Sequence, residues 1–153
     1  MPRIVRDAEV TWNGSLARGG GEITAGTSGA FTALPYSLPA RIGNPEGRTS
    51  PEELLAAAHG GCFAMSLANE LGSAGATVEQ VQVWCRITMD EVEGKGHQIV
   101  HSAISASARG DGMDGDTLDR AIAAADAGCS FSVMLRSSGA AVETSTTGVR
   151  DGD

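Results

Sequence analysis

The sequence is poor in aromatic residues and in positive charge. Three Phe, two Trp and one Tyr are the whole aromatic content of 153 residues. Because aromatic side chains bury the largest area per residue, the core must come from Ala, Val, Leu and Ile, with room for a second chain to complete it. Eleven Lys and Arg against nineteen Asp and Glu give a net charge of −8. This sign disfavours a surface that neutralises nucleic-acid phosphates or anionic lipid.

Long apolar runs are missing as well. None approaches the ~20 residues of a membrane span, and the first residues, MPRIVRDAEVTWNG, lack the apolar region of a signal peptide. The three cysteines, at positions 62, 85 and 129, are odd in number and widely spaced, unlike a disulfide framework. We therefore expect a soluble cytoplasmic protein with free thiols. The length fits one domain over residues 1–153.

The first forty-five residues indicate short strands followed by a loop. Alternating stretches at 8–12 and 22–24 are separated by Asn-Gly and by the glycines at 19–21, which predicts a meander of two or three strands. The glycine triplet lacks the helix and Lys-Ser/Thr of a phosphate-binding loop, so we interpret it as a turn. Residues 34–45 contain three prolines and are predicted to form an exposed loop.

A long helix follows, with a strong start signal. Ser50 stands at the N-cap position, Pro51 at the first helical position and Glu at the third, the capping-box pattern. The helix is expected to continue from Leu54 to about Leu71 and to end at Gly72. Its apolar stripe is predicted at Leu55, Ala58, Cys62, Met65 and Asn69.

The second half alternates strands and helices in an α+β order. Residues 78–90 alternate apolar and polar side chains, and the Gly-Lys-Gly at 94–96 predicts a hairpin into a strand over 97–108. A helix capped by Asp114 or Asp116 should run to Ala127 and break at Gly128. The remaining expectations are a helical turn over 130–135, a strand over 140–147 and a loose tail over 148–153. Strands in hairpins rather than βαβ units fit the α+β class.

The cysteines differ in their surroundings. Cys62 lies on the apolar stripe of the long helix, where a free cysteine is most often inert core. Cys129 follows a helix break, where unsatisfied backbone N–H groups and a helix dipole favour a thiolate. Cys62 and Cys129 could therefore be a peroxidatic and resolving pair. Cys85 sits on the apolar face of a strand, which favours an unreactive thiol.

Two segments resemble one known family. The stretch RTSPEELLAAAHGGCFAMSL at 48–67 resembles the signature helix of the OsmC/Ohr thiol peroxidases, and AGCSFSV at 127–133 resembles their second-cysteine segment. The similarity extends to VTWNG at 10–14 and PARI at 39–42, closer to the OsmC branch, and covers nearly the whole chain. It implies an α+β OsmC-like fold with antiparallel hairpins around a long central helix, in an intertwined homodimer.

The resemblance also implies a reaction. Cys62 would attack an organic hydroperoxide and become a sulfenic acid, and Cys129 would resolve it to an intramolecular disulfide. A thiol reductant, a dihydrolipoyl or thioredoxin-like protein, would close the cycle, without a cofactor or metal. The apolar stripe around Cys62 suits a hydroperoxide with a hydrocarbon tail.

Charged partners are implied by the same resemblance. Arg41 would hold Cys62 as the thiolate and polarise the peroxide, and Glu52 would orient Arg41 by bidentate pairing. Arg18 and Arg48 are the rival arginines, and the sequence leaves this choice open. The chain departs from the family pattern at Gly60-Gly61, where Ala or Ser is more usual.

Helix geometry constrains this arrangement. Cys62 lies ten residues beyond Glu52, which is roughly 15 Å along a continuous helix and about 80° around it. The two side chains cannot meet within one straight helix. Either the helix bends near Gly60-Gly61, or another element or a second subunit brings the groups together.

Two other classes of function remain open. A Cys–His acyl-transfer enzyme would use His59 or His101 as the base for Cys62, although no oxyanion motif is legible. A small-ligand-binding module on the same fold is the other alternative. No Cys or His pair has zinc-ligand spacing, and His97 and His101 are expected on the hairpin surface.

Overall fold

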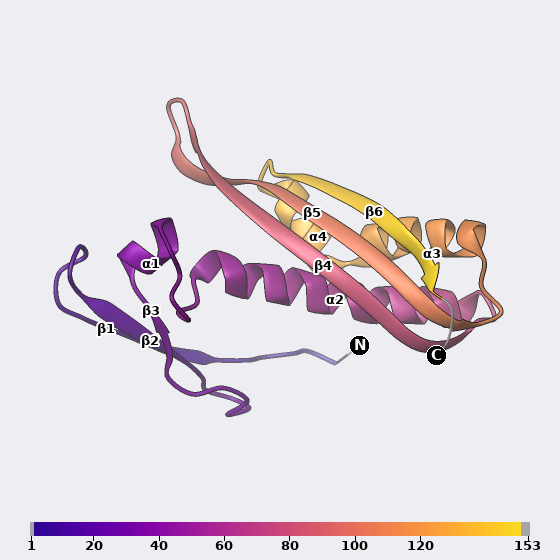
Figure 1. Ribbon diagram of the computed structural model, residues 1–153, viewed down its shortest axis with the longest axis horizontal. Coiled ribbons are helices and arrows are strands. Elements are labelled where there is room, and N and C mark those ends of the chain that lie inside the picture. Colours follow the sequence, from indigo (N-terminus) through magenta and orange to yellow (C-terminus); the bar gives the residue numbers. More distant parts are fainter. Residues whose placement is uncertain (1, 151–153) are drawn as a thin grey trace. The chain divides into compact units, whose positions relative to one another are not determined.

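The computed structural model describes residues 2–150, which form two compact units that divide between Pro51 and Glu52. Figure 1 shows the elements of both units. The single domain over 1–153 stays a prediction. Among the described residues, no helix combines the length and the apolar character needed to cross a membrane.

The N-terminal unit is built on a small antiparallel sheet. Strands β1 (Ala8–Asn13), β2 (Gly20–Ala25) and β3 (Leu34–Tyr36) lie in the order β1-β2-β3. The predicted meander is therefore confirmed, with three strands. The Trp12 and Tyr36 rings pack at 5.4 Å between centroids. Gly21 lies under Tyr36, because a Cβ there would come within 2.4 Å of the ring.

The predicted loop over 34–45 is wrong in its first part. Besides β3, this segment contains the short helix α1 (Leu38–Ile42). The Ser37 hydroxyl accepts a hydrogen bond from the Ala40 backbone N–H, and Pro39 occupies the first turn, where its missing N–H costs nothing. Pro39 therefore lies at the start of a helix, and the capping Ser37 was the signal in the sequence that predicts it.

The C-terminal unit contains the remaining elements. They are α2 (Pro51–Ser73), β4 (Thr77–Val92), β5 (Gly96–Asp111), α3 (Gly115–Gly128), α4 (Ser130–Ser137) and β6 (Ala141–Arg150). The helix start at Pro51, the turn at 94–96 and the break before α4 are as predicted, and Asp114 is the residue that caps α3. The tail prediction is wrong for 148–150, which belong to β6, and residues 151–153 lie outside the described residues.

The second sheet has the order β4-β5-β6. β4 and β5 pair as the predicted antiparallel hairpin, which Figure 1 shows as two long ribbons joined by a narrow loop. β6 departs from the hairpin pattern, because it runs parallel to β5. Helices α3 and α4 connect these two strands, and a helical crossover returns the chain in the same direction. The α+β class holds with this one parallel pairing.

The core of this unit lies on one face of the sheet. Phe63, Leu67 and Leu71 of α2 are fully buried, together with Ile104 of β5 and Leu118 of α3. The buried positions of α2 are therefore 59, 63, 67 and 71, spaced by four. The predicted stripe is wrong in its C-terminal part, because Met65 is 78% exposed and Asn69 is exposed as well. The buried stripe begins with a histidine, which an apolar pattern does not detect.

Adjacent glycines of α2 have opposite surroundings. A Cβ at Gly60 would lie 3.3 Å from Cβ of Cys85, whereas a Cβ at Gly61 would meet nothing within 4 Å. Gly60 therefore lets α2 approach β4 closely. We expect Gly61→Ala to stabilise the fold by about 0.5–1 kcal/mol through helix propensity. Gly60→Ala should not be stabilised in this way, because its new methyl group would crowd Cβ of Cys85. Urea unfolding of both variants measures the difference, and equal stabilisation would contradict the close approach.

Candidate active site

Cys62 and Cys129 come together although 67 positions separate them. Cys62 lies midway along α2 and is partly buried, whereas Cys129 is the fully buried residue between α3 and α4. Cys62 packs against the core cluster that contains Cys129, and both are free thiols. The structure therefore brings together the two cysteines that the sequence analysis paired.

Opposing influences act on the Cys62 thiol. Burial raises its pKa, and the adjacent Cys129 thiol raises it further, as a hydrogen-bonding side chain and as a charge. Backbone N–H groups of Phe131 and Ser130 act in the other direction. The net result is a Cys62 pKa above its ordinary value. Within this unit the neutral thiol is therefore favoured at pH 7.

The start of α4 explains how these N–H groups reach the sulfur. Cys129 has an extended backbone, with φ −76° and ψ 117°, so α3 ends and α4 begins anew at Ser130. The first N–H groups of a helix have no partner inside it, and they carry the positive end of its dipole. The sequence predicts that such N–H groups favour a thiolate at Cys129. In the structure, the N–H groups of Ser130 and Phe131 instead lower the pKa of Cys62.

The predicted arginines lie in the N-terminal unit. Arg41 is in the last turn of α1 and lines a cavity of about 200 Å³ with Trp12 and Tyr36. Arg18 and Arg48 line a separate cavity of about 380 Å³ beside Ser37. Arg48 also lies 4.0 Å from the Glu46 carboxylate. The choice among the three arginines therefore stays a prediction.

Glu52 lies in the first turn of α2, on the same helix as Cys62. The helix is continuous from Pro51 to Ser73 and so passes through Gly60-Gly61, and Figure 1 shows α2 as one unbroken coil. A continuous helix keeps the offset of roughly 15 Å between the two positions. The Glu52 carboxylate and the Cys62 sulfur of one helix therefore cannot meet directly. They can act at one site only if another element or another subunit brings such groups together.

A buried polar network beside the cysteines was missed by the sequence analysis. His59 is fully buried; its Nδ1 lies 2.7 Å from Ser102 Oγ of β5 and its Nε2 lies 2.8 Å from Ser132 Oγ of α4. Burial lowers the pKa of His59, and Asp126 and Arg136 act on it in opposite directions. The ring is therefore neutral at pH 7. The sequence offered one signal for the burial of His59: it lies four residues before Phe63 and therefore on the same face of the helix.

Neither candidate base for acyl transfer has Cys62 as a hydrogen-bond partner among the described residues. The sulfur of Cys85 lies 3.7 Å from Nδ1 of His59. His101 Nε2 lies 3.0 Å from the Glu143 carboxylate. Burial raises the pKa of Cys85, as expected for the unreactive thiol of the sequence analysis. The geometry therefore offers no Cys–His pair at Cys62.

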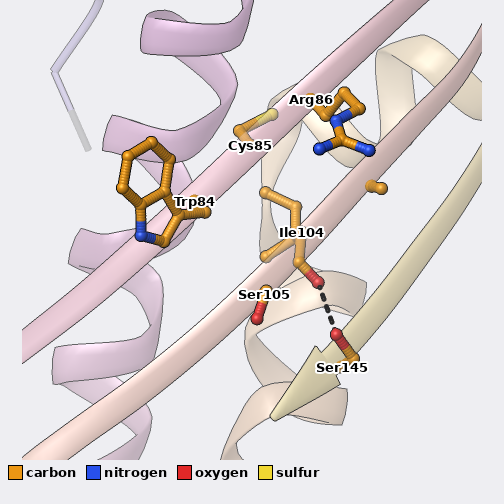
Figure 2. Close-up of a pocket in the computed structure, with 7 residues that line it drawn as sticks. Trp84, Cys85, Arg86, Ile104, Ser105 and Ser145 are labelled. Carbon is orange, nitrogen blue, oxygen red and sulfur yellow. Dashed lines mark hydrogen bonds between the residues drawn. The ribbon is translucent and has the colours of Figure 1, made fainter. Parts of the chain in front are cut away.

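A groove of about 490 Å³ lies over the other face of the second sheet. Figure 2 shows Trp84 and Arg86 of β4 with Ser105 of β5 and Ser145 of β6 along it. Strand alternation places Trp84 and Arg86 opposite to Cys85, which faces α2. The groove is therefore separate from the cysteine pair.

Comparisons with known proteins point to one family. Residues 43–145 match the family model described as OsmC-like protein. The chain is 34% identical over 133 residues to "Peroxiredoxin OsmC" of Escherichia coli K12, which covers 87% of this chain and 91% of the relative. A protein of the same name from Shigella flexneri matches equally.

Solved structures show the same fold. An organic hydroperoxide resistance protein OsmC from Legionella pneumophila superposes with a TM-score of 0.71 at 22% identity, covering 94% of this chain and 98% of that one. The organic hydroperoxide resistance protein OhrB of Bacillus subtilis gives 0.68 at 20% identity, covering 92% and 98%. Because the chain matches this family model and the Escherichia coli relative, it belongs to the OsmC-like protein family.

Proposed function

We propose that the protein is a cysteine-dependent peroxidase that reduces organic hydroperoxides in oxidative-stress defence in the cytoplasm. The observation that carries the proposal is the meeting of Cys62 and Cys129 at the start of α4. The name peroxiredoxin of the Escherichia coli relative, 34% identical, supports the same reaction class. A peroxidase needs one thiol to be oxidised and a second within reach to resolve it.

The reaction has two balanced steps. The Cys62 thiolate attacks the distal oxygen of the hydroperoxide, the O–O bond breaks, and the leaving alkoxide takes a proton to become an alcohol. Cys62 is then a sulfenic acid. The Cys129 sulfur attacks the sulfenic sulfur, an S–S bond forms, and the hydroxyl group leaves as water with the proton of Cys129. A dithiol, such as a dihydrolipoyl or thioredoxin-like protein, reduces the disulfide.

Arg41 is proposed to supply a positive charge beside Cys62. The surroundings of Cys62 within that unit raise its pKa, so a nucleophilic thiolate needs a cation from elsewhere. Arg41 resembles the family arginine, and Glu52 would orient it by pairing with the guanidinium. The helix offset between Glu52 and Cys62 fits a shared site better than a local one.

The apolar surroundings of Cys62 set the expected substrate preference. Cys62 and Phe131 both pack against the apolar core. A hydrocarbon tail gains burial there that hydrogen peroxide cannot gain. We expect kcat/KM for cumene hydroperoxide to exceed that for hydrogen peroxide by at least about tenfold, or ~1.4 kcal/mol. Steady-state assays with dihydrolipoamide measure both, and an equal or reversed ratio would contradict the organic preference.

A homodimer is proposed to complete the site. The described part of the N-terminal unit buries only Gly21, Ile23 and Ala40, too little for an independent core. Exposed apolar side chains remain in both units: Ile4, Val5, Val10, Leu16, Ile42 and Met65 are each more than half exposed. An isologous partner would cover such surfaces.

Light scattering at low micromolar concentration should give twice the chain mass of 15.6 kDa. A fully active monomer would contradict the dimer. Subunit exchange between Cys62→Ser and Glu52→Ala chains then tests whether sites are shared. Recovered activity requires each site to draw Cys62 and Glu52 from different chains, whereas no recovery places both groups in one chain.

A further inference from the structure

The contact between α2 and α4 has two parts, one turn apart on each helix. Cys62 meets Cys129, and His59, three residues earlier on α2, bonds Ser132, three residues after Cys129. Residues three apart share a helix face. The imidazole–hydroxyl bond therefore lies one helical turn from the sulfur pair.

The His59–Ser132 bond is held from both sides. His59, Ser102 and Ser132 are each fully buried, and both ring nitrogens of His59 lie within 2.8 Å of a hydroxyl oxygen. Rotation of the ring would leave buried polar groups without partners, which is unfavourable. Ser102 belongs to β5, so the network fixes α4 to the sheet as well as to α2.

Besides Ser132, helix α4 is anchored near its start by the side chain of Phe131, which is partly buried against the apolar core. It has eight residues, of which only Ser132 and Leu135 are buried, whereas Val133 and Met134 are about half exposed. Cys129 makes no side-chain capping bond at its N-terminus. The ion pair of Arg136 with Asp126 holds the opposite end of α4. Near the start of α4, where Cys129 lies, the bond between His59 and Ser132 is therefore the polar contact that adds to this apolar packing.

We propose that His59 is a positioning residue for the resolving step, holding Cys129 against Cys62 through Ser132. This inference rests on the proposed peroxidase function. A disulfide forms only when the two Cβ atoms lie ~3.5–4.5 Å apart, so a displaced α4 start removes Cys129 from reach of the sulfenic sulfur. In this step the S–S bond forms between Cys62 and Cys129. The hydroxyl group of the Cys62 sulfenic acid leaves as water with the thiol proton of Cys129.

The test separates attack from resolution. Reduced protein receives one equivalent of cumene hydroperoxide, and a dimedone probe measures the Cys62 sulfenic acid while mass spectrometry measures the disulfide. We expect Ser132→Ala to slow disulfide formation at least tenfold more than it slows sulfenic acid formation, so that trapped sulfenic acid accumulates. Ser132→Thr keeps the hydroxyl and should restore resolution. Ser137→Ala is the matched control, because Ser137 is exposed, belongs to the same helix and donates its hydroxyl hydrogen bond to Val133 O.

The outcomes are distinct. Equal slowing of both steps in Ser132→Ala, or resolution at the wild-type rate, would overturn the positioning role. A wild-type protein that forms no sulfenic acid would refute the proposed function instead. If Ser132→Ala does not fold, the double variant His59→Leu/Ser132→Ala removes both partners and leaves Ser102 with Cys85, 3.5 Å away. The same accumulation of sulfenic acid is expected there, and normal resolution would again overturn the role.

Discussion

Replacing Cys62 by serine is expected to reduce hydroperoxide turnover to the uncatalysed background, a loss of more than about a thousandfold. A serine hydroxyl cannot form a sulfenic acid, and Cys129 is fully buried, so it should not substitute as the first nucleophile. Turnover of cumene hydroperoxide with excess dithiol measures the loss.

The other two cysteines provide the controls. Cys129→Ser should complete one attack and stop at the sulfenic acid, seen as one trapped adduct per chain. Cys85→Ser should keep both steps, because burial raises the pKa of Cys85 and favours the unreactive thiol. A similar loss of turnover in all three variants would contradict these separate roles.

Replacing Arg41 by alanine is expected to raise the pKa of Cys62 further and to slow its attack on the hydroperoxide by at least about tenfold at pH 7. The reason is that burial and Cys129 already raise this pKa, while only the backbone N–H groups of Ser130 and Phe131 oppose them within the C-terminal unit. The rate of iodoacetamide alkylation against pH measures the shift in a Cys85→Ser background.

Arg18→Ala is the matched variant, because Arg18 lies in the same N-terminal unit and lines a different cavity from Arg41. It should leave the alkylation profile close to that of the parent. If Arg18→Ala shifts the profile and Arg41→Ala does not, the arginine has been assigned to the wrong position.

Local signals were enough to predict much of the C-terminal unit. Pro51 begins α2, alternation marks β4, and Gly128 precedes the break at Cys129. Each of these depends on neighbours in sequence. Local surroundings only suggested that Cys62 and Cys129 could form a pair, because these residues are far apart in the sequence, and the family resemblance implied their disulfide.

The failures have physical causes too. Met65 was assigned to the buried stripe because it is apolar, but α2 buries the polar His59, whose partners lie on β5 and α4. Such partners are distant in sequence, so the burial of His59 cannot be predicted from the helix alone. The parallel pairing of β6 with β5 likewise depends on how α3 and α4 pack.

The most direct test of the account is to locate the bond that peroxide creates. Reduced protein is treated with one equivalent of cumene hydroperoxide, its remaining thiols are alkylated, and peptides are mapped without reduction. We expect a Cys62–Cys129 disulfide within one chain and an alkylated Cys85. A disulfide that includes Cys85, or a pair that stays fully alkylated, would contradict it.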